Sequence, residues 1–171
     1  MQLQDRTRRL TVLALLAAAA FVLSWLDSQI PLTGMLPGAK LGLGNLAVLS
    51  GIYLLGPGPA SILCILKILL STLLFGNAYS FFYSMAGGLL SFLGMLLARK
   101  QCSVMFVSVL GGMLHNLGQI AVAAVILETA GLWGYFPVLL LCGIGAGLAV
   151  GTVGGILIQR MKRILPFLLS K

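Results

Sequence analysis

Long apolar runs make up most of this chain, separated by short breaks that are polar or rich in glycine and proline. Five of the runs approach the ~20 residues that a helix needs to cross the hydrocarbon core of a bilayer. A sixth run is shorter and ends at the sequence Gly-Pro-Gly-Pro. The pattern predicts an all-α integral membrane protein with helices at residues 10–26, 42–55, 59–75, 79–98, 103–128 and 135–160.

The continuous apolar part of the run at 42–55 has only about 11 residues, fewer than a helix needs to span a bilayer. Whether this run crosses the membrane therefore determines if the chain has five or six spans. Basic residues form clusters at 6–9, 99–100 and 160–163. If the short run crosses, all three clusters lie on one side, as the positive-inside rule requires. Five crossings would place the last two clusters opposite the first. We therefore expect a six-helix bundle with both termini cytoplasmic, multi-pass in the plasma membrane of a bacterium.

Composition agrees with this class. Hydrophobic residues make up 60% of the chain and charged residues 8%, and the mean hydropathy is +1.10. The formal net charge of +8 lies mainly at the ends of apolar runs, where it orients a membrane protein, so nucleic acid is not an expected partner. The length of 171 residues predicts a single membrane domain, 1–171. The first helix has no small-residue cleavage site after it and is expected to be retained.

The segment 27–44 is a predicted outward loop, long for so small a protein and rich in glycine and proline. It ends in the sequence PGAKLGLGN, which offers backbone amides, the cation of Lys40 and the side-chain amide of Asn45. Such glycine-rich amides can hold an anion. A surface loop whose lysine touches lipid headgroups explains the segment equally well.

Lys67 lies near the middle of a predicted span, on one helical face with Ser61, Cys64 and Ser71. An unpaired cation at that depth is costly, and intramembrane charges commonly mark a pathway or a binding site. Lys67 is therefore a candidate substrate-binding residue.

Two further polar faces follow on the next helices. Asn77 and Ser84 share one with Ser80, Ser91 and a glycine pair, and His115 and Gln119 share another, with Asn116 about a quarter-turn away. Such faces can serve helix packing alone, and the histidine can tie two helices together. If they converge, they form a pocket that opens outward and reaches half-way into the membrane. The candidate substrate-binding residues are Lys40, Asn45, Lys67, Asn77, Ser84, His115, Asn116 and Gln119.

Several chemistries are disfavoured. The three acids, Asp5, Asp27 and Glu128, are far apart in sequence, whereas prenyl transfer with magnesium needs clustered carboxylates. The chain has no phosphate-binding loop for ATP, and its three cysteines lack the spacing of a zinc or redox site. We expect no enzyme activity, no metal and no cofactor. His115 and Lys67 are the titratable groups expected in the interior.

Three motifs carry a family resemblance: PGAKLGLGN at 37–45, GNAYSFFYSMAGG at 76–88 and GGMLHNLGQ at 111–119. Together they resemble the Gx transporter family, which is also labelled heptaprenyl diphosphate synthase component I. The resemblance covers about residues 10 to 160. Gly44 stands where that family pattern has alanine, a small-for-small change.

This resemblance implies a fold similar to the substrate-binding S components of energy-coupling factor transporters, with an outward pocket capped by the loop after the first helix. It also implies partners, namely a transmembrane coupling subunit and two ATP-binding cassette subunits. In that group a small-residue face of the first helix contacts the coupling subunit. Ala14 and Ala18 match such a face, although alanine-rich membrane helices commonly only pack.

The leading hypothesis is a membrane subunit that binds a small anionic or amphipathic precursor for uptake, with a link to isoprenoid or quinone metabolism. A second hypothesis is a non-catalytic membrane subunit that anchors or regulates a soluble prenyl diphosphate synthase through cytoplasmic basic residues. A third is a carrier or channel that works alone. The absence of an acidic motif argues against catalysis by this chain.

Overall fold

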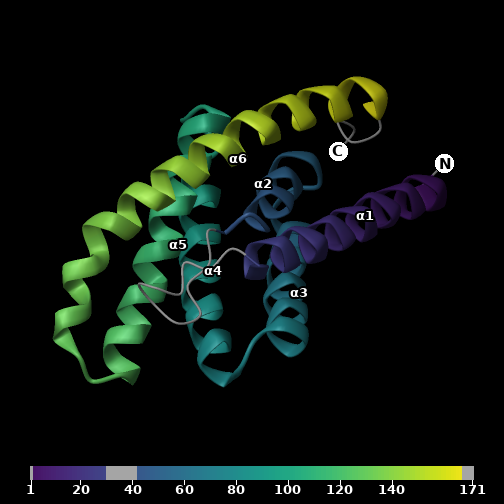
Figure 1. The fold of residues 1–171 in the computed structure, drawn as a ribbon. Coiled ribbons are helices and arrows are strands. Elements are labelled where there is room, and N and C mark those ends of the chain that lie inside the picture. Colours follow the sequence, from purple (N-terminus) through teal and green to yellow (C-terminus); the bar gives the residue numbers. More distant parts are fainter. Residues whose placement is uncertain (1, 30–41, 167–171) are drawn as a thin grey trace.

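The structure, a computed structural model, describes residues 2–29 and 42–166, and every regular element in these ranges is a helix (Figure 1). The all-α class is confirmed. Lys40 lies outside the described residues. The elements are α1 (Gln2–Gln29), α2 (Asn45–Leu54), α3 (Pro57–Phe75), α4 (Ala78–Ala98), α5 (Val104–Ile126), the short 3₁₀ helix η2 (Ala130–Tyr135) and α6 (Phe136–Ile164).

Five of the described helices are long and apolar enough to cross a membrane, which makes the chain a multi-pass membrane protein. The largest change from expectation is at α1, which continues to Gln29. The prediction that a loop begins at residue 27 was wrong, because Asp27 is still helical and lies inside the protein. Because it is buried, Asp27 becomes part of the candidate site described below.

Local signals explain where the other helices begin. Gly56 has φ +90°, a conformation that favours glycine, and it separates α2 from α3. Pro57 occupies the first position of α3, where a missing N–H costs nothing. The side chains of Asn77 and Ser103 cap α4 and α5 by accepting hydrogen bonds from backbone N–H groups.

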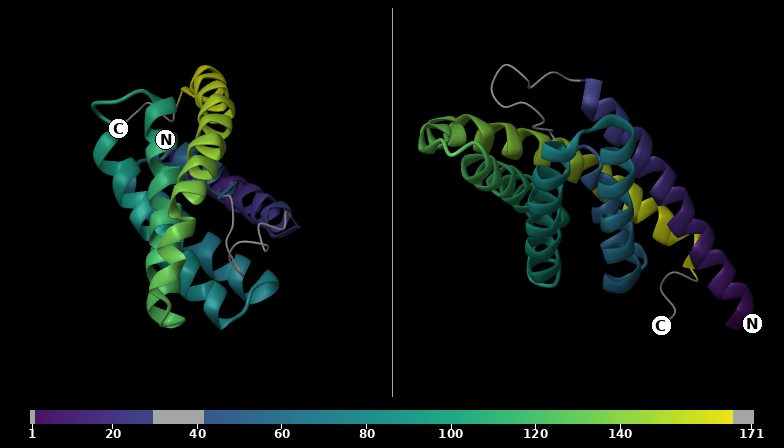
Figure 2. Two further views of the ribbon diagram at one scale, coloured as in Figure 1. Left: turned by 60° about the vertical axis from the view of Figure 1, so that its left-hand side comes forward. Right: turned by 90° about the horizontal axis from the view of Figure 1, so that it is seen from below.

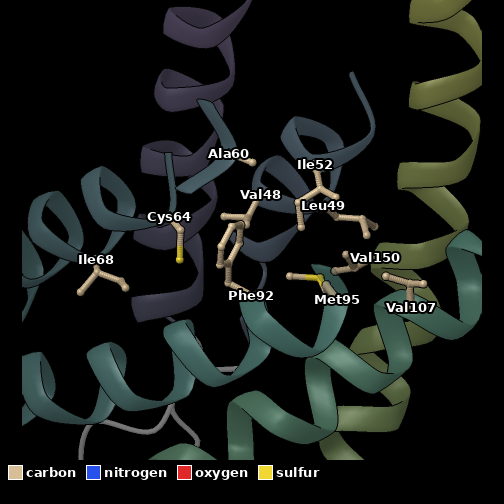
Figure 3. Close-up of a cluster of buried hydrophobic side chains, with 10 residues drawn as sticks. All are labelled: Val48, Leu49, Ile52, Ala60, Cys64, Ile68, Phe92, Met95, Val107 and Val150. Carbon is tan, nitrogen blue, oxygen red and sulfur yellow. The ribbon is translucent and has the colours of Figure 1, made fainter. Parts of the chain in front are cut away.

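The short α2 lies at the centre of the fold and packs against α1, α3, α4, α5 and α6. Eight of its ten residues are buried, as expected for a helix that is apolar on all sides. Figure 3 shows Leu49 and Ile52 of α2 beside Met95 and Val150, in the core that α2 shares with α4 and α6. Its neighbours therefore cover the backbone of this helix, which is too short to span hydrocarbon unaided.

Helices α4, α5 and α6 pack closely because glycines face each other across their contacts. A Cβ atom at Gly147 would lie 2.6 Å from the Cα atom of Val109, and one at Gly118 would lie 2.8 Å from the backbone of Ala86. Contacts this short leave no room for a side chain. Small residues let membrane helices approach backbone to backbone, so these glycines set the helix spacing.

The described basic residues other than the buried Lys67 lie toward one end of the molecule. Arg99 donates a hydrogen bond to the carbonyl oxygen of Ile52 at 3.3 Å, near the end of α2. Arg6 and Arg9 line a groove with Leu55 and Pro59, just beyond that point. The first turns of α1 also lie close to the last turns of α6, which carry the remaining basic cluster (Figures 1 and 2).

Candidate functional site

The four residues 42–45, which lead into α2, are the meeting point of polar groups from three other helices. Gly42 has φ +84°, so its position favours glycine, and the chain turns there into the first hydrogen bonds of α2. Side chains from α1, α3 and α5 contact this segment. We call the segment and those side chains the polar cluster: Ser24, Asp27, Gly42–Asn45, Lys67 and His115.

Asp27 holds the beginning of the segment. Its Oδ2 atom accepts hydrogen bonds from the backbone N–H of Gly42 at 2.8 Å and of Leu43 at 3.1 Å. The residue is 3% exposed. These two hydrogen bonds satisfy backbone N–H groups in the interior that would otherwise have no acceptor there. His115 and Lys67 are both buried as expected, but the expectation that the interior has no other titratable group was wrong, since the carboxyl group of Asp27 is buried as well.

Lys67 holds the end of the segment. It lies in the middle of α3, is 8% exposed, and its Nζ atom donates to the Oδ1 atom of Asn45 at 2.7 Å. The backbone at Gly44 passes close to the lysine stem, since a Cβ there would be 2.8 Å from Lys67 Cε and 2.6 Å from Ser24 Oγ. The cluster thus places an ammonium group and a carboxyl group on the same four-residue segment. When both groups carry their charges, opposite charges on one short segment reduce the cost of burying either.

His115 of α5 lies between that segment and α4. A Cβ at Gly42 would lie 3.2 Å from the imidazole Cδ2 atom, and one at Gly87 would lie 3.1 Å from its Nδ1 atom. Glycine at both positions lets the backbone approach the ring closely. The imidazole, which is 3% exposed, is therefore fixed against the backbone of the polar cluster.

Several polar atoms in or beside the cluster have no hydrogen-bond partner among the described residues. They are buried, and the set includes Ser24 Oγ, Ser108 Oγ and both amide atoms of Gln119. A cavity of about 10 Å³, enough for about one water molecule, lies against Gly42, Asn45 and Ser108. Buried polar atoms usually have partners, so atoms without one require an explanation such as water or a ligand.

The remaining predicted site residues have other surroundings. Asn116 donates to the carbonyl oxygen of Leu139 at 2.6 Å and so ties α5 to α6. Ser84 is buried on α4, and Asn77 is exposed at the turn between α3 and α4. The structure therefore brings Asn45, Lys67 and His115 together, whereas none of the described hydrogen bonds joins Asn77 or Asn116 to them.

Asn77 has a structural role that predicts a measurable effect. Its Oδ1 atom accepts from the backbone N–H of Ser80 at 2.8 Å. We expect Asn77→Ala to lower the free energy of unfolding by about 1 kcal/mol, the usual cost of losing an N-cap. Ser103→Ala, which removes the corresponding cap of α5, is the matched variant and should cost a similar amount in the same chemical denaturation experiment. A cost above about 3 kcal/mol would show that Asn77 does more than cap a helix.

The sequence reasoning missed Ser24 and Asp27. A signal for them exists, because Ala20, Ser24 and Asp27 follow one another at steps of four and three residues, the spacing of one helical face. All three are buried in the structure. Extending the first predicted helix with this spacing would have placed the Asp27 carboxyl group in the protein interior.

Two further observations concern possible partners and ligands. Ala14 and Ala18 are exposed on α1, as a contact surface would require. Among residues 2–29 and 42–166, no three His, Cys, Asp or Glu side chains are grouped as a metal site would need. The polar cluster offers hydrogen-bond donors and acceptors, among them one carboxyl group, one amine and one imidazole.

Comparison with known proteins places the chain in a family. Neither the search of curated proteins nor the search of solved structures found a match. A family model does match, over residues 16–157, which is most of the chain. Its description is heptaprenyl diphosphate synthase component I, and the chain belongs to that family, the Gx transporter family of membrane proteins.

Proposed function

We propose that this protein is a substrate-binding membrane subunit, similar to the S components of energy-coupling factor transporters, that captures a small precursor for uptake. The observation that carries this proposal is the polar cluster. Asp27, Lys67 and His115 come from three apolar helices and meet on one segment in the interior. Polar and ionisable groups inside membrane proteins are costly, and they are typical of binding sites and pathways.

The buried groups without partners support a ligand site over a purely structural network. A network that serves only packing gains most when every member is satisfied. Here Ser108 and Gln119 have buried polar atoms with no partner among the described residues. Those atoms are available to a ligand or to water.

The ligand class follows from the groups at hand. An anionic or otherwise oxygen-bearing ligand would take the place of Asn45 Oδ1 at Lys67 Nζ, and Ser108 would donate to it. Asp27 balances part of the positive charge, which favours a ligand with one negative charge over a highly charged diphosphate. The cavity of about 10 Å³ is too small for such a molecule, so binding requires the segment 42–45 to shift. The family description names a prenyl diphosphate synthase component, which supports the proposal that the ligand has a link to isoprenoid or quinone metabolism.

Our proposed topology has six spans with both termini in the cytoplasm of a bacterium. The clustering of Arg6, Arg9 and Arg99 near the end of α2 supports it, since positive charge marks the cytoplasmic side. In this arrangement α2 is a short central crossing covered by its neighbours, and the polar cluster lies at its outward end.

The proposed partners are a transmembrane coupling subunit and two ATP-binding cassette subunits. The exposed Ala14 and Ala18 provide a small-residue surface on α1 where a helix of the coupling subunit can pack. The chain itself is proposed to have no enzyme activity. The family description favours one alternative, a non-catalytic membrane subunit that anchors a prenyl diphosphate synthase.

Native mass spectrometry of the gently purified wild-type protein separates these functions. The proposal predicts a co-purified small molecule, and in preparations from its own cells, the coupling and ATP-binding subunits. A protein that carries a soluble synthase and no small molecule would contradict the proposal and support the anchoring role.

A further inference from the structure

Two grooves flank the N-terminal half of α1, and both combine arginine with an apolar wall. One has a volume of about 530 Å³ and runs between α1 and the end of α6. Its lining residues are Arg8, Thr11, Val12, Leu15, Ile164, Leu165 and Pro166. The other, of about 270 Å³, lies between α1 and the start of α3, where Arg6 and Arg9 accompany Leu10, Leu13, Leu55 and Pro59.

We propose that the groove between α1 and α6 binds an anionic phospholipid, with its phosphate at Arg8 and an acyl chain along the apolar wall. The wall faces outward, since Leu15 is 64% and Ile164 71% exposed. The polar end and the apolar end of the groove match the two parts of a phospholipid. Basic pockets between membrane helices on the cytoplasmic side are typical sites for acidic headgroups.

The charge around this groove favours an anionic headgroup over a neutral one. Lys162 and Arg163 lie in the last turn of α6, one turn or less from the groove's Ile164. Among the described acids, Asp5 lies near the groove, and its carboxylate is 4.0 Å from the Arg8 guanidinium in a solvent-exposed ion pair. Such a pair contributes little, so it does not compete strongly with a phosphate.

A third groove provides an internal comparison. It lies at the turn between α3 and α4, has a volume of about 410 Å³, and is lined by Leu69, Thr72, Leu73, Asn77, Ala78, Phe81 and Phe82. This groove has apolar side chains that can contact an acyl chain. Because no basic residue lines it, it has no cation that can bind a phosphate. The cation at the rim, and not the apolar surface alone, therefore distinguishes the two grooves beside α1 from this one.

The test is native mass spectrometry of the full chain after exchange into detergent with equal amounts of phosphatidylglycerol and phosphatidylcholine. We expect the wild-type protein to retain phosphatidylglycerol preferentially. Arg8→Gln should reduce its retention about fivefold, the contribution of one basic side chain to binding an acidic lipid surface. Thr11→Trp should reduce it as well, by filling the groove without changing the charge. Lys100→Gln, which removes an exposed cation from outside both grooves, should leave retention unchanged.

Equal retention of the two lipids, or unchanged phosphatidylglycerol in both Arg8→Gln and Thr11→Trp, would overturn the proposal. Should Arg8→Gln fail to fold, as judged by size-exclusion chromatography, Thr11→Trp decides the question alone. A protein subunit retained in place of lipid and lost in these variants would also overturn the lipid assignment. The proposal is independent of the ligand in the polar cluster, because no groove residue belongs to that cluster.

Discussion

Asp27→Ala is expected to lower the free energy of unfolding by about 3–6 kcal/mol, since a hydrogen bond to a charged group contributes about 1.5–3 kcal/mol and Asp27 accepts two. The variant leaves the N–H groups of Gly42 and Leu43 without their acceptor. It also removes the carboxyl group that shares the segment 42–45 with the Lys67 amine. The change can be measured as a shift of the denaturation midpoint in mild detergent.

Asp5→Ala is the matched control, because it removes the same side chain from the same helix at an exposed position. Its ion pair with Arg8 is exposed, and such pairs contribute about 0–1 kcal/mol. If the two alanine variants lose the same stability, Asp27 does not hold the segment 42–45 as described. Asp27→Asn should fall between them, since an amide oxygen can still accept but carries no charge.

Gly147→Ala is expected to destabilise the protein by about 1–2 kcal/mol, because a backbone clash belongs in the upper part of the usual overpacking cost of about 1–3 kcal/mol and alanine regains about 1 kcal/mol in a helix. The added Cβ would meet the Cα atom of Val109 at 2.6 Å and the carbonyl oxygen of Ser108 at 2.9 Å. Both are backbone atoms of α5, so the clash is relieved only by separating α5 from α6. This cost exceeds the ~1 kcal/mol that alanine gains over glycine in a helix.

Gly145→Ala tests the same substitution on the same helix without the contact. A Cβ at Gly145 would have no neighbour within 4 Å. Only the helix propensity then changes, and we expect a stability equal to or up to about 1 kcal/mol above that of the wild type. Thermal unfolding of the two variants should therefore shift in opposite directions. A destabilised Gly145→Ala protein, or an unaffected Gly147→Ala protein, would contradict this account of helix packing.

The length of the apolar runs was sufficient to predict the helical class, because a backbone that crosses hydrocarbon must satisfy its own hydrogen bonds, as a helix does. The runs also identified Lys67 and His115, since polar groups within such runs are conspicuous. They did not identify the central position of α2. An apolar run of this length looks the same whether it faces lipid or five other helices, and only the contacts made by Leu49 and Ile52 distinguish the two.

The sequence also failed to place Asp27, for a physical reason. A charged residue beside a glycine- and proline-rich segment normally marks the end of a membrane helix and faces water. Here the carboxylate is stabilised by backbone N–H groups fifteen and sixteen residues later in the chain. That compensation depends on the positive φ of Gly42 and on the path of residues 42–45, which local patterns do not reveal. Asn77 shows the opposite case, a polar residue on a predicted site face that caps a helix.

The measurement that tests the proposed site most directly is the fraction of purified protein that carries a small molecule, determined by native mass spectrometry for Lys67→Met and Lys100→Met. The two variants make the same chemical change, at a buried position and at an exposed one. Losing a charge-assisted hydrogen bond to the ligand should lower affinity about 10- to 100-fold in Lys67→Met. We therefore predict a bound molecule in the wild type and in Lys100→Met and its loss in Lys67→Met. Equal retention in all three proteins would contradict a substrate site at the polar cluster.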